Sequence, residues 1–249
     1  MESGRVLRNS QIIILGVCIA FATVASSVIL SRGFMKLMKF TKEVISVTGS
    51  ANKLITSDLA TWDISFARRN TDLAAAYQDL KKDLDRVKSY LRSKGIADSE
   101  MVVSQVYTVT LYKKNSDGYD TNEIEGYRLS QSVTVRSPDV DRITALSRES
   151  TELINEGIAV NSSAPQYFYT KIDELKVEML ARATENAKQR AASMAKSTGN
   201  RIGTIRSAKM GVFQITPVNS TEVSDWGVND TSSLEKKVTS VVNVSFAIE

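Results

Sequence analysis

The chain has 249 residues, of which 42% are hydrophobic and 24% are charged, a composition typical of a globular protein with a substantial core. It has no histidine and a single cysteine, so it lacks the commonest general base and metal ligand and cannot form an internal disulfide. The formal charge is +4, but residues 1–42 alone carry +5 and the rest of the chain carries −1. A nucleic-acid-binding domain is usually basic, so this distribution argues against nucleic acid as a partner and favours a membrane surface.

An uncharged apolar segment at residues 12–30 follows a short N-terminal tail at residues 1–11. As a helix the segment would be about 28 Å long, close to the hydrocarbon core of a bilayer at about 30 Å. Arg5 and Arg8 precede it, and Arg32 follows it closely. We therefore predict a transmembrane anchor at residues 12–30, with a lipid bilayer as the partner.

Two kinds of cleaved signal compete with the anchor. Thr23-Val24-Ala25 is a passable end for a secretory signal, but the apolar segment is longer than the usual core of about 7–15 residues. A lipoprotein signal needs a small residue before its cysteine, whereas Val17 precedes Cys18. The retained anchor is the favoured interpretation. Charge is a poor guide to its orientation, because the positive-inside rule taken literally would place the following domain in the cytoplasm.

Residues 31–42 form a basic and amphipathic neck. Apolar residues can share one helical face there while the lysine side chains extend towards water. The candidate membrane-surface residues are Arg32, Lys36, Lys39 and Lys42. Two interpretations stay open, a helix lying in the membrane interface and a helical extension that joins the anchor to the domain.

Residues 43–249 are predicted to form one domain that opens with two strands. The first, at residues 43–50, is rich in β-branched residues and is expected to turn at Gly49. The second, at residues 54–69, alternates residue by residue in the pattern of a half-buried strand.

The first helix of the domain has one apolar face. Its apolar residues recur at alternating spacings of four and three: Leu73, Tyr77, Leu80, Leu84, Val87 and Leu91. Thr71 and Asp72 suit the N-terminal turn, and Gly95 suits the C-terminal cap. Asp83 and Asp85 are interpreted as part of the solvated face of this helix.

A hairpin and a second helix follow. The strands at residues 101–114 and 123–137 are joined by an Asn-Ser-Asp-Gly turn, which is a hairpin signal. Pro138 is predicted to open a helix with Ser137 as its N-cap, and Gly157 to end it.

The last part of the chain holds a strand at residues 158–169, a long helix at 171–197, and strands at 202–212 and 237–248. The segment between those last strands, residues 213–233, has little pattern. Small residues on the long helix allow close approach to a sheet or another helix: Ala183, Ala187, Ala191 and Ala195. The order of strands and helices predicts the α+β class, with helices packed on an antiparallel or mixed sheet.

Several segments together resemble the SIMPL-domain family. These are the opening strand with Gly49, the Gly126-Tyr127 pair ahead of Val133-Thr134-Val135, the alanine-rich helix ending at Gly199, and the closing strand at residues 241–246. The resemblance covers roughly residues 43–249. It implies a bacterial envelope protein outside the cytoplasm, like the periplasmic immunogenic and oxidative-stress defence proteins of the family, some of which assemble into rings or cages. It defines no catalytic residues and overrules the weak charge argument for a cytoplasmic domain.

No pattern for catalysis, metal binding or phosphate binding is present in the sequence. Nucleophilic triads usually need a histidine, calcium loops need a fixed spacing of oxygen ligands, and the glycines are too dispersed for a phosphate loop. We therefore expect no enzyme activity, no cofactor and no small-molecule substrate.

The candidate interface or binding residues are aromatic: Tyr167, Phe168, Tyr169 and Trp226. For the first three, the alternative is a cluster lying half in the core and half on the surface, and for Trp226 it is a loop plug. The leading hypothesis is a single-pass protein of the bacterial inner membrane whose periplasmic domain self-assembles, with a link to envelope or oxidative stress. The second hypothesis is a ligand- or peptide-binding module with a pocket near these aromatic residues.

Overall fold

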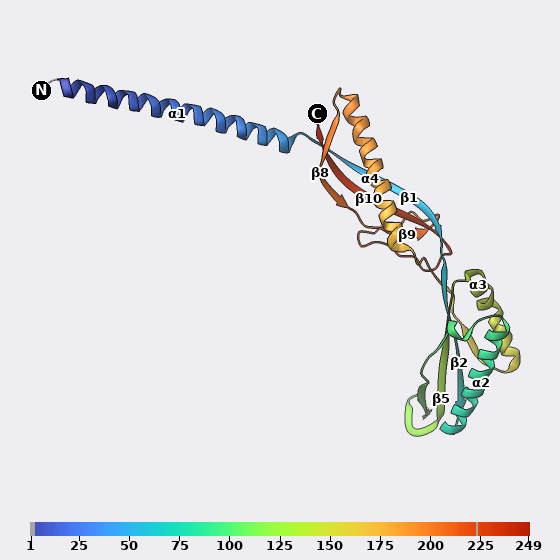
Figure 1. The fold of residues 1–249 in the computed structure, drawn as a ribbon. Helices are drawn as coiled ribbons and strands as arrows, with labels where there is room; N and C mark the ends of the chain where they lie inside the picture. The colour runs from blue at the N-terminus through green and yellow to red at the C-terminus, as the bar shows by residue number, and fades with distance from the viewer. Residues whose placement is uncertain (1–2, 223) are drawn as a thin grey trace. The chain divides into compact units, whose positions relative to one another are not determined.

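The computed structural model describes residues 3–222 and 224–249, with side chains for 14–35, 43–222 and 224–249 (Figure 1). Helix α1 (Ser3–Lys42) is one continuous helix of 40 residues. Its stretch Ile14–Met35 has a mean hydropathy of 2.3 and is 0% buried, so it is long and apolar enough to cross a membrane. The neck is therefore a helical extension of this stretch; Arg32 is exposed, while the side chains of Lys36, Lys39 and Lys42 lie outside the described residues.

The chain divides into two compact units built from non-contiguous segments. Unit 1 comprises Met1–Ala51, Leu180–Gly211 and Val241–Glu249, and unit 2 comprises Asn52–Met179 and Val212–Ser240. Three long elements continue from one unit into the other: β1 (Val44–Thr56), α4 (Ile172–Ser197) and β10 (Glu235–Ile248). The α+β class predicted from the sequence is confirmed.

Unit 1 is a small sheet with one helix packed on it. Its strands lie in the order β1-β10-β8, where β8 is Ile202–Met210 and pairs antiparallel with β10. The alanine face of α4 is fully covered, as expected from the sequence. It forms the core with apolar residues of the strands: Val47, Ala183, Ala187, Ala191, Val242, Val244 and Phe246.

The turn predicted at Gly49 is wrong, because β1 runs straight through this residue. A Cβ on Gly49 would lie 2.2 Å from the carbonyl oxygen of Ala183 and 2.6 Å from the Cβ of Ala187. Glycine here allows the backbones of β1 and α4 to approach closely rather than reversing the chain. Strand β1 ends at Thr56, and β2 (Leu59–Asn70) begins after residues 57–58.

Unit 2 is built on the long antiparallel pair β2 and β5 (Asp120–Ser137). The short strands β3 (Met101–Val103) and β4 (Tyr107–Lys114) pair with β5. Two others, β6 (Val160–Ser162) and β7 (Gln166–Phe168), pair with β2, and β9 (Gln214–Pro217) pairs with the start of β10. The single strand predicted at residues 158–169 is thus two strands, interrupted next to Pro165, which has no N–H to donate.

Helices α2 (Leu73–Ser93) and α3 (Val140–Glu149) pack on the β2–β5 pair (Figure 1). Short 3-10 helices lie at Asp98–Glu100 and Ser150–Glu156. The caps predicted for α2 are confirmed, since the Asp72 carboxylate accepts from the N–H of Ala75 at 2.7 Å and Gly95 has φ +86°. The cap predicted at Ser137 is wrong: α3 begins at Val140, so Asp139 occupies the N-cap position and its carboxylate accepts from the N–H of Arg142.

The buried face of α2 differs from the apolar face predicted for it. Leu73 and Tyr77 are 44% and 48% exposed, whereas Ala76 and Asp83 are buried. The Asp83 carboxylate is paired with the Arg68 guanidinium from β2, and this hydrogen bond raises the pKa of Arg68. The interpretation of Asp83 as a solvated residue is therefore wrong, although Asp85 is exposed.

Candidate functional site

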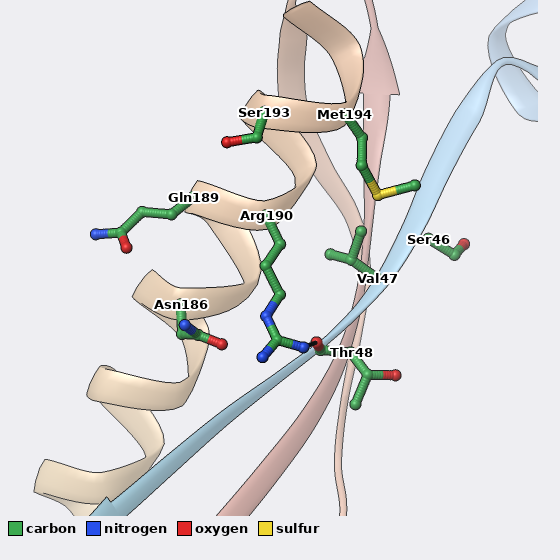
Figure 2. Close-up of a pocket in the computed structure, with 8 residues that line it drawn as sticks. All are labelled: Ser46, Val47, Thr48, Asn186, Gln189, Arg190, Ser193 and Met194. Carbon is green, nitrogen blue, oxygen red and sulfur yellow. Dashed lines mark hydrogen bonds between the residues drawn. The ribbon is translucent and has the colours of Figure 1, made fainter. Parts of the chain in front are cut away.

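A groove of about 640 Å³ lies in unit 1 between β1 and α4 (Figure 2). Strand β1 contributes the first three lining residues and α4 the other five: Ser46, Val47, Thr48, Asn186, Gln189, Arg190, Ser193 and Met194. The α4 side chains follow one another at helical spacing, next to the alanine face that is buried against the sheet. The groove thus exists because the close packing of α4 on β1 leaves the polar flank of the helix beside the strand.

Hydrogen bonds fix the walls of this groove. The Arg190 guanidinium donates to the carbonyl oxygen of Thr48 at 3.0 Å, as Figure 2 shows. Further along the strand, the N–H of Ser50 donates to the Asn186 side chain at 3.1 Å. The Thr48 hydroxyl is held in turn by Asn243 of β10, at 2.6 Å.

The lining of the groove favours binding over catalysis. It offers hydroxyl, amide and guanidinium groups, which donate hydrogen bonds to an anionic or polar ligand. The lining residues include neither a carboxylate nor a thiol that could serve as a general base or nucleophile. Sequence patterns point only weakly to this site, because Asn186 and Arg190 are four apart on α4 but their partners on β1 lie far away in the chain.

None of the aromatic residues predicted as an interface lines this groove, and they differ in burial. Tyr167 is only 9% exposed and packs in the core of unit 2, where its hydroxyl shares a hydrogen bond with Thr144 at 2.9 Å. Phe168 and Tyr169 are half-buried. Trp226, in contrast, is 95% exposed.

Trp226 is exposed on a well-tethered segment. The Gln214 side chain donates to the carbonyl oxygen of Ser224 at 2.6 Å and accepts from the N–H of Val228 at 2.9 Å. Gly227, next to the tryptophan, has φ +90°, and its N–H donates to Ser224. The indole is therefore presented to solvent by a fixed turn rather than packed as a loop plug.

A buried lysine holds the same segment from the other side. Lys236 is 2% exposed, and its ammonium group donates to the carbonyl oxygens of Tyr167, at 2.9 Å, and of Asp230. Burial lowers the pKa of Lys236, and the charge of Asp230 offsets only part of this effect. The amine thus ties the 213–233 segment to strand β7 without being accessible for chemistry.

We expect Lys236→Met to cost about 1–3 kcal/mol of stability at neutral pH, because two buried carbonyl oxygens lose their donor. The folded chain releases the Lys236 proton at lower pH than the unfolded chain, whose ordinary value is 10.5. Between the lowered pKa and 10.5 the unfolded state binds more protons at this lysine than the folded state does. The free energy of unfolding of the wild type should therefore rise with pH relative to that of the variant. Denaturant titrations over that range measure this difference. The exposed Lys81→Met serves as control, and a difference that shrank with pH would contradict the assignment.

The two units differ strongly in charge. Unit 1 contains 13 basic and 4 acidic residues, a net charge of +9, whereas unit 2 contains 19 basic and 24 acidic residues, a net charge of −5. This division is hard to see along the sequence, because the basic residues of unit 1 come from two segments, 1–51 and 180–211, that lie far apart in the chain. The near-neutral domain expected from the sequence therefore contains a basic and an acidic part.

These features define an α+β domain that follows directly on a long apolar helix. Residues 45–246 match the SIMPL family, which is described as a protein family of unknown function (DUF541). The chain belongs to this family, as the resemblance of its strands and alanine-rich helix predicted. No curated protein matches the chain.

Proposed function

We propose that this chain is a non-catalytic, membrane-anchored protein of the bacterial envelope whose periplasmic domains assemble with one another. The observation that carries the anchor is the fully exposed apolar stretch Ile14–Met35, which has no protein surface to cover it among the described residues. In water, a helix with this much apolar surface would be strongly unfavourable, whereas a bilayer solvates it. The inner-membrane location, the periplasmic side and a role in envelope or oxidative stress rest on the family resemblance alone.

Assembly is supported by exposed apolar and strand surfaces. Trp226 is 95% exposed on a fixed turn, and tryptophan is the residue type most enriched at the energetic centres of interfaces. Strand β8 lies at the edge of the unit 1 sheet and carries the exposed side chains of Ile205 and Met210. An anchor on every copy raises the local concentration, so contacts of modest strength suffice to close a ring or cage.

We expect Trp226→Ala to weaken assembly by about 30-fold or more, the loss typical of an interface hot spot, without lowering the melting temperature. The melting temperature should stay unchanged because the indole packs against little of its own chain. Light scattering and electron microscopy of the full chain in detergent or nanodiscs measure the assembly. Tyr119→Ala, which removes another aromatic side chain that is 72% exposed, is the matched control.

Two outcomes would contradict this proposal. A full-length chain that stays monomeric at all concentrations would exclude self-assembly. An equal loss with Tyr119→Ala would show that Trp226 has no special place in the contact. The anchor is tested separately, since a spanning chain stays in the membrane pellet after alkaline extraction.

A ligand-binding role is the second candidate, and the groove between β1 and α4 favours it. None of the four aromatic residues predicted to surround a ligand lines this groove. A ligand-binding function would therefore depend on Arg190 and its neighbours instead.

A further inference from the structure

Basic side chains gather on the folded part of unit 1, beyond the anchor. Residues 43–51, 180–211 and 241–249 carry seven basic and three acidic residues. All seven basic residues are exposed on α4, on β8 or between them: Arg182, Lys188, Arg190, Lys196, Arg201, Arg206 and Lys209. Four of these side chains have no partner among the described residues: Lys188, Lys196, Arg201 and Lys209.

The charges of unit 2 are used differently. Many of its basic residues are neutralised within the unit, as in the pair of Lys113 with Glu123 at 2.9 Å. Lys94 contacts two carboxylates, those of Glu149 at 2.8 Å and Glu152 at 3.3 Å. Unit 1 thus has a net positive charge, whereas the net charge of unit 2 is negative.

The chain itself keeps unit 1 near the bilayer that α1 would span. Only residues 36–43 separate the apolar stretch ending at Met35 from the first residue of β1, Val44. Fully extended, eight residues reach about 28 Å, and as a helix they reach about 12 Å. A surface held this close meets the lipid headgroups at high effective concentration.

We propose that the exposed basic side chains of unit 1, with Arg190 of the groove among them, bind the phosphate headgroups of anionic lipids in the bilayer spanned by α1. One guanidinium nitrogen of Arg190 donates a hydrogen bond to the Thr48 carbonyl oxygen, and the remaining N–H groups of this side chain have no partner among the described residues. Gln189 and Ser193 line the groove beside it and can donate to the same phosphate oxygens. The other basic side chains contribute to the attraction without specific geometry.

This inference rests on the proposed anchoring in a membrane. The acidic unit 2 of a second copy offers the competing partner of opposite charge. The lipid surface is favoured because the short tether holds it beside unit 1 in every copy, whereas a second copy must first be recruited.

The test places a fluorophore on unit 1 and measures energy transfer to acceptors on lipid headgroups. Starting from the full chain with Cys18→Ser, Ser197→Cys labels an exposed position on α4 of unit 1 outside the groove, and Ser89→Cys labels an exposed position on α2 of unit 2. Nanodiscs hold one copy each and contain either phosphatidylglycerol or phosphatidylcholine. We expect transfer from position 197, but not from position 89, to rise with phosphatidylglycerol. The rise should disappear at about 1 M salt, where the screening length is about 3 Å.

Neutral variants locate the contact. Arg190→Gln, Lys188→Gln and Lys196→Gln should each reduce the ratio of docked to undocked protein about fivefold, equivalent to about 1 kcal/mol. Lys81→Gln, an exposed lysine of unit 2, should leave it unchanged. Circular dichroism checks that each variant is folded, which is expected because all of these side chains are exposed.

Two outcomes overturn the proposal. Equal transfer in the two lipids would show that unit 1 does not recognise anionic headgroups. A rise that appears only in discs prepared with two copies would show that the basic side chains of unit 1 contact a second copy instead. Recovery of the chain with the discs reports the anchor independently, so a failure of anchoring is distinguished from a failure of headgroup binding.

Discussion

Replacing Arg68 with methionine is expected to destabilise unit 2 by about 3–5 kcal/mol, because it leaves a buried carboxylate without its partner. The Asp83 side chain is 2% exposed, and both of its oxygens accept hydrogen bonds from Arg68, one of them at 2.7 Å. Arg68 also donates to the carbonyl oxygen of Gly157 at 3.0 Å, so it joins β2, α2 and the end of the second 3-10 helix. Removing it disrupts all three contacts at once.

Denaturant titration of the full chain measures this loss. Trp62 is 0% exposed in the core of unit 2, so its fluorescence reports this unit once Trp226 is replaced by phenylalanine. Arg92→Met breaks an exposed ion pair with Asp98 and should cost less than about 1 kcal/mol.

The double variant provides the sharper test of the buried pair. Replacing Arg68 by methionine and Asp83 by leucine removes both charges and fills the site with apolar atoms, so much of the lost stability should return. A double variant less stable than the Arg68→Met single variant would contradict this explanation. It would show that the loss of the ion pair, rather than the unpaired Asp83 carboxylate left in the single variant, lowers the stability of this unit.

Gly49→Ala is expected to destabilise unit 1 by about 3 kcal/mol, at the upper end of the usual cost of overpacking. The new methyl group would lie 2.2 Å from the carbonyl oxygen of Ala183 and 2.6 Å from the backbone nitrogen of Ala187. These are backbone atoms of α4, so the helix as a whole must move away from β1. Because the groove lies along the same contact, its shape should change as well.

Hydrogen exchange is the suitable measurement for this unit, since both tryptophans lie in unit 2. A loss of about 3 kcal/mol should speed the exchange of the most protected amides of α4 about 100-fold. Gly203→Ala in β8 is the matched control, because its methyl group would meet only the side chain of Glu249, which can swing aside. Similar acceleration in both variants would contradict a specific contact at Gly49.

Local patterns in the sequence predicted most of the elements and their class. The caps Asp72 and Gly95 were found because capping depends on residues adjacent in the chain. The apolar helix is predictable because nineteen uncharged residues form a strong signal by themselves. The alanine face of α4 was read as a close contact because helical spacing alone brings these residues together.

The errors lie where a residue's role depends on a partner distant in the sequence. The sequence predicts a turn at Gly49 because glycine usually marks one, whereas the structure packs Gly49 against a helix more than 130 residues later. Asp83 was placed in solvent because a carboxylate on a helix normally faces water, and only Arg68 makes its burial tolerable. Tyr167 was a candidate for binding, but it lies mostly within the core of unit 2.

By itself, the sequence determined a long apolar helix, an α+β domain of the SIMPL family, and an absence of catalytic patterns. Only the tertiary structure decided which strand meets α4, where the polar groove forms, and how the charges divide between a basic and an acidic unit. The reason is physical: helix periodicity, capping and hydropathy act within a few residues, whereas the groove and the charge division join segments separated by well over a hundred residues.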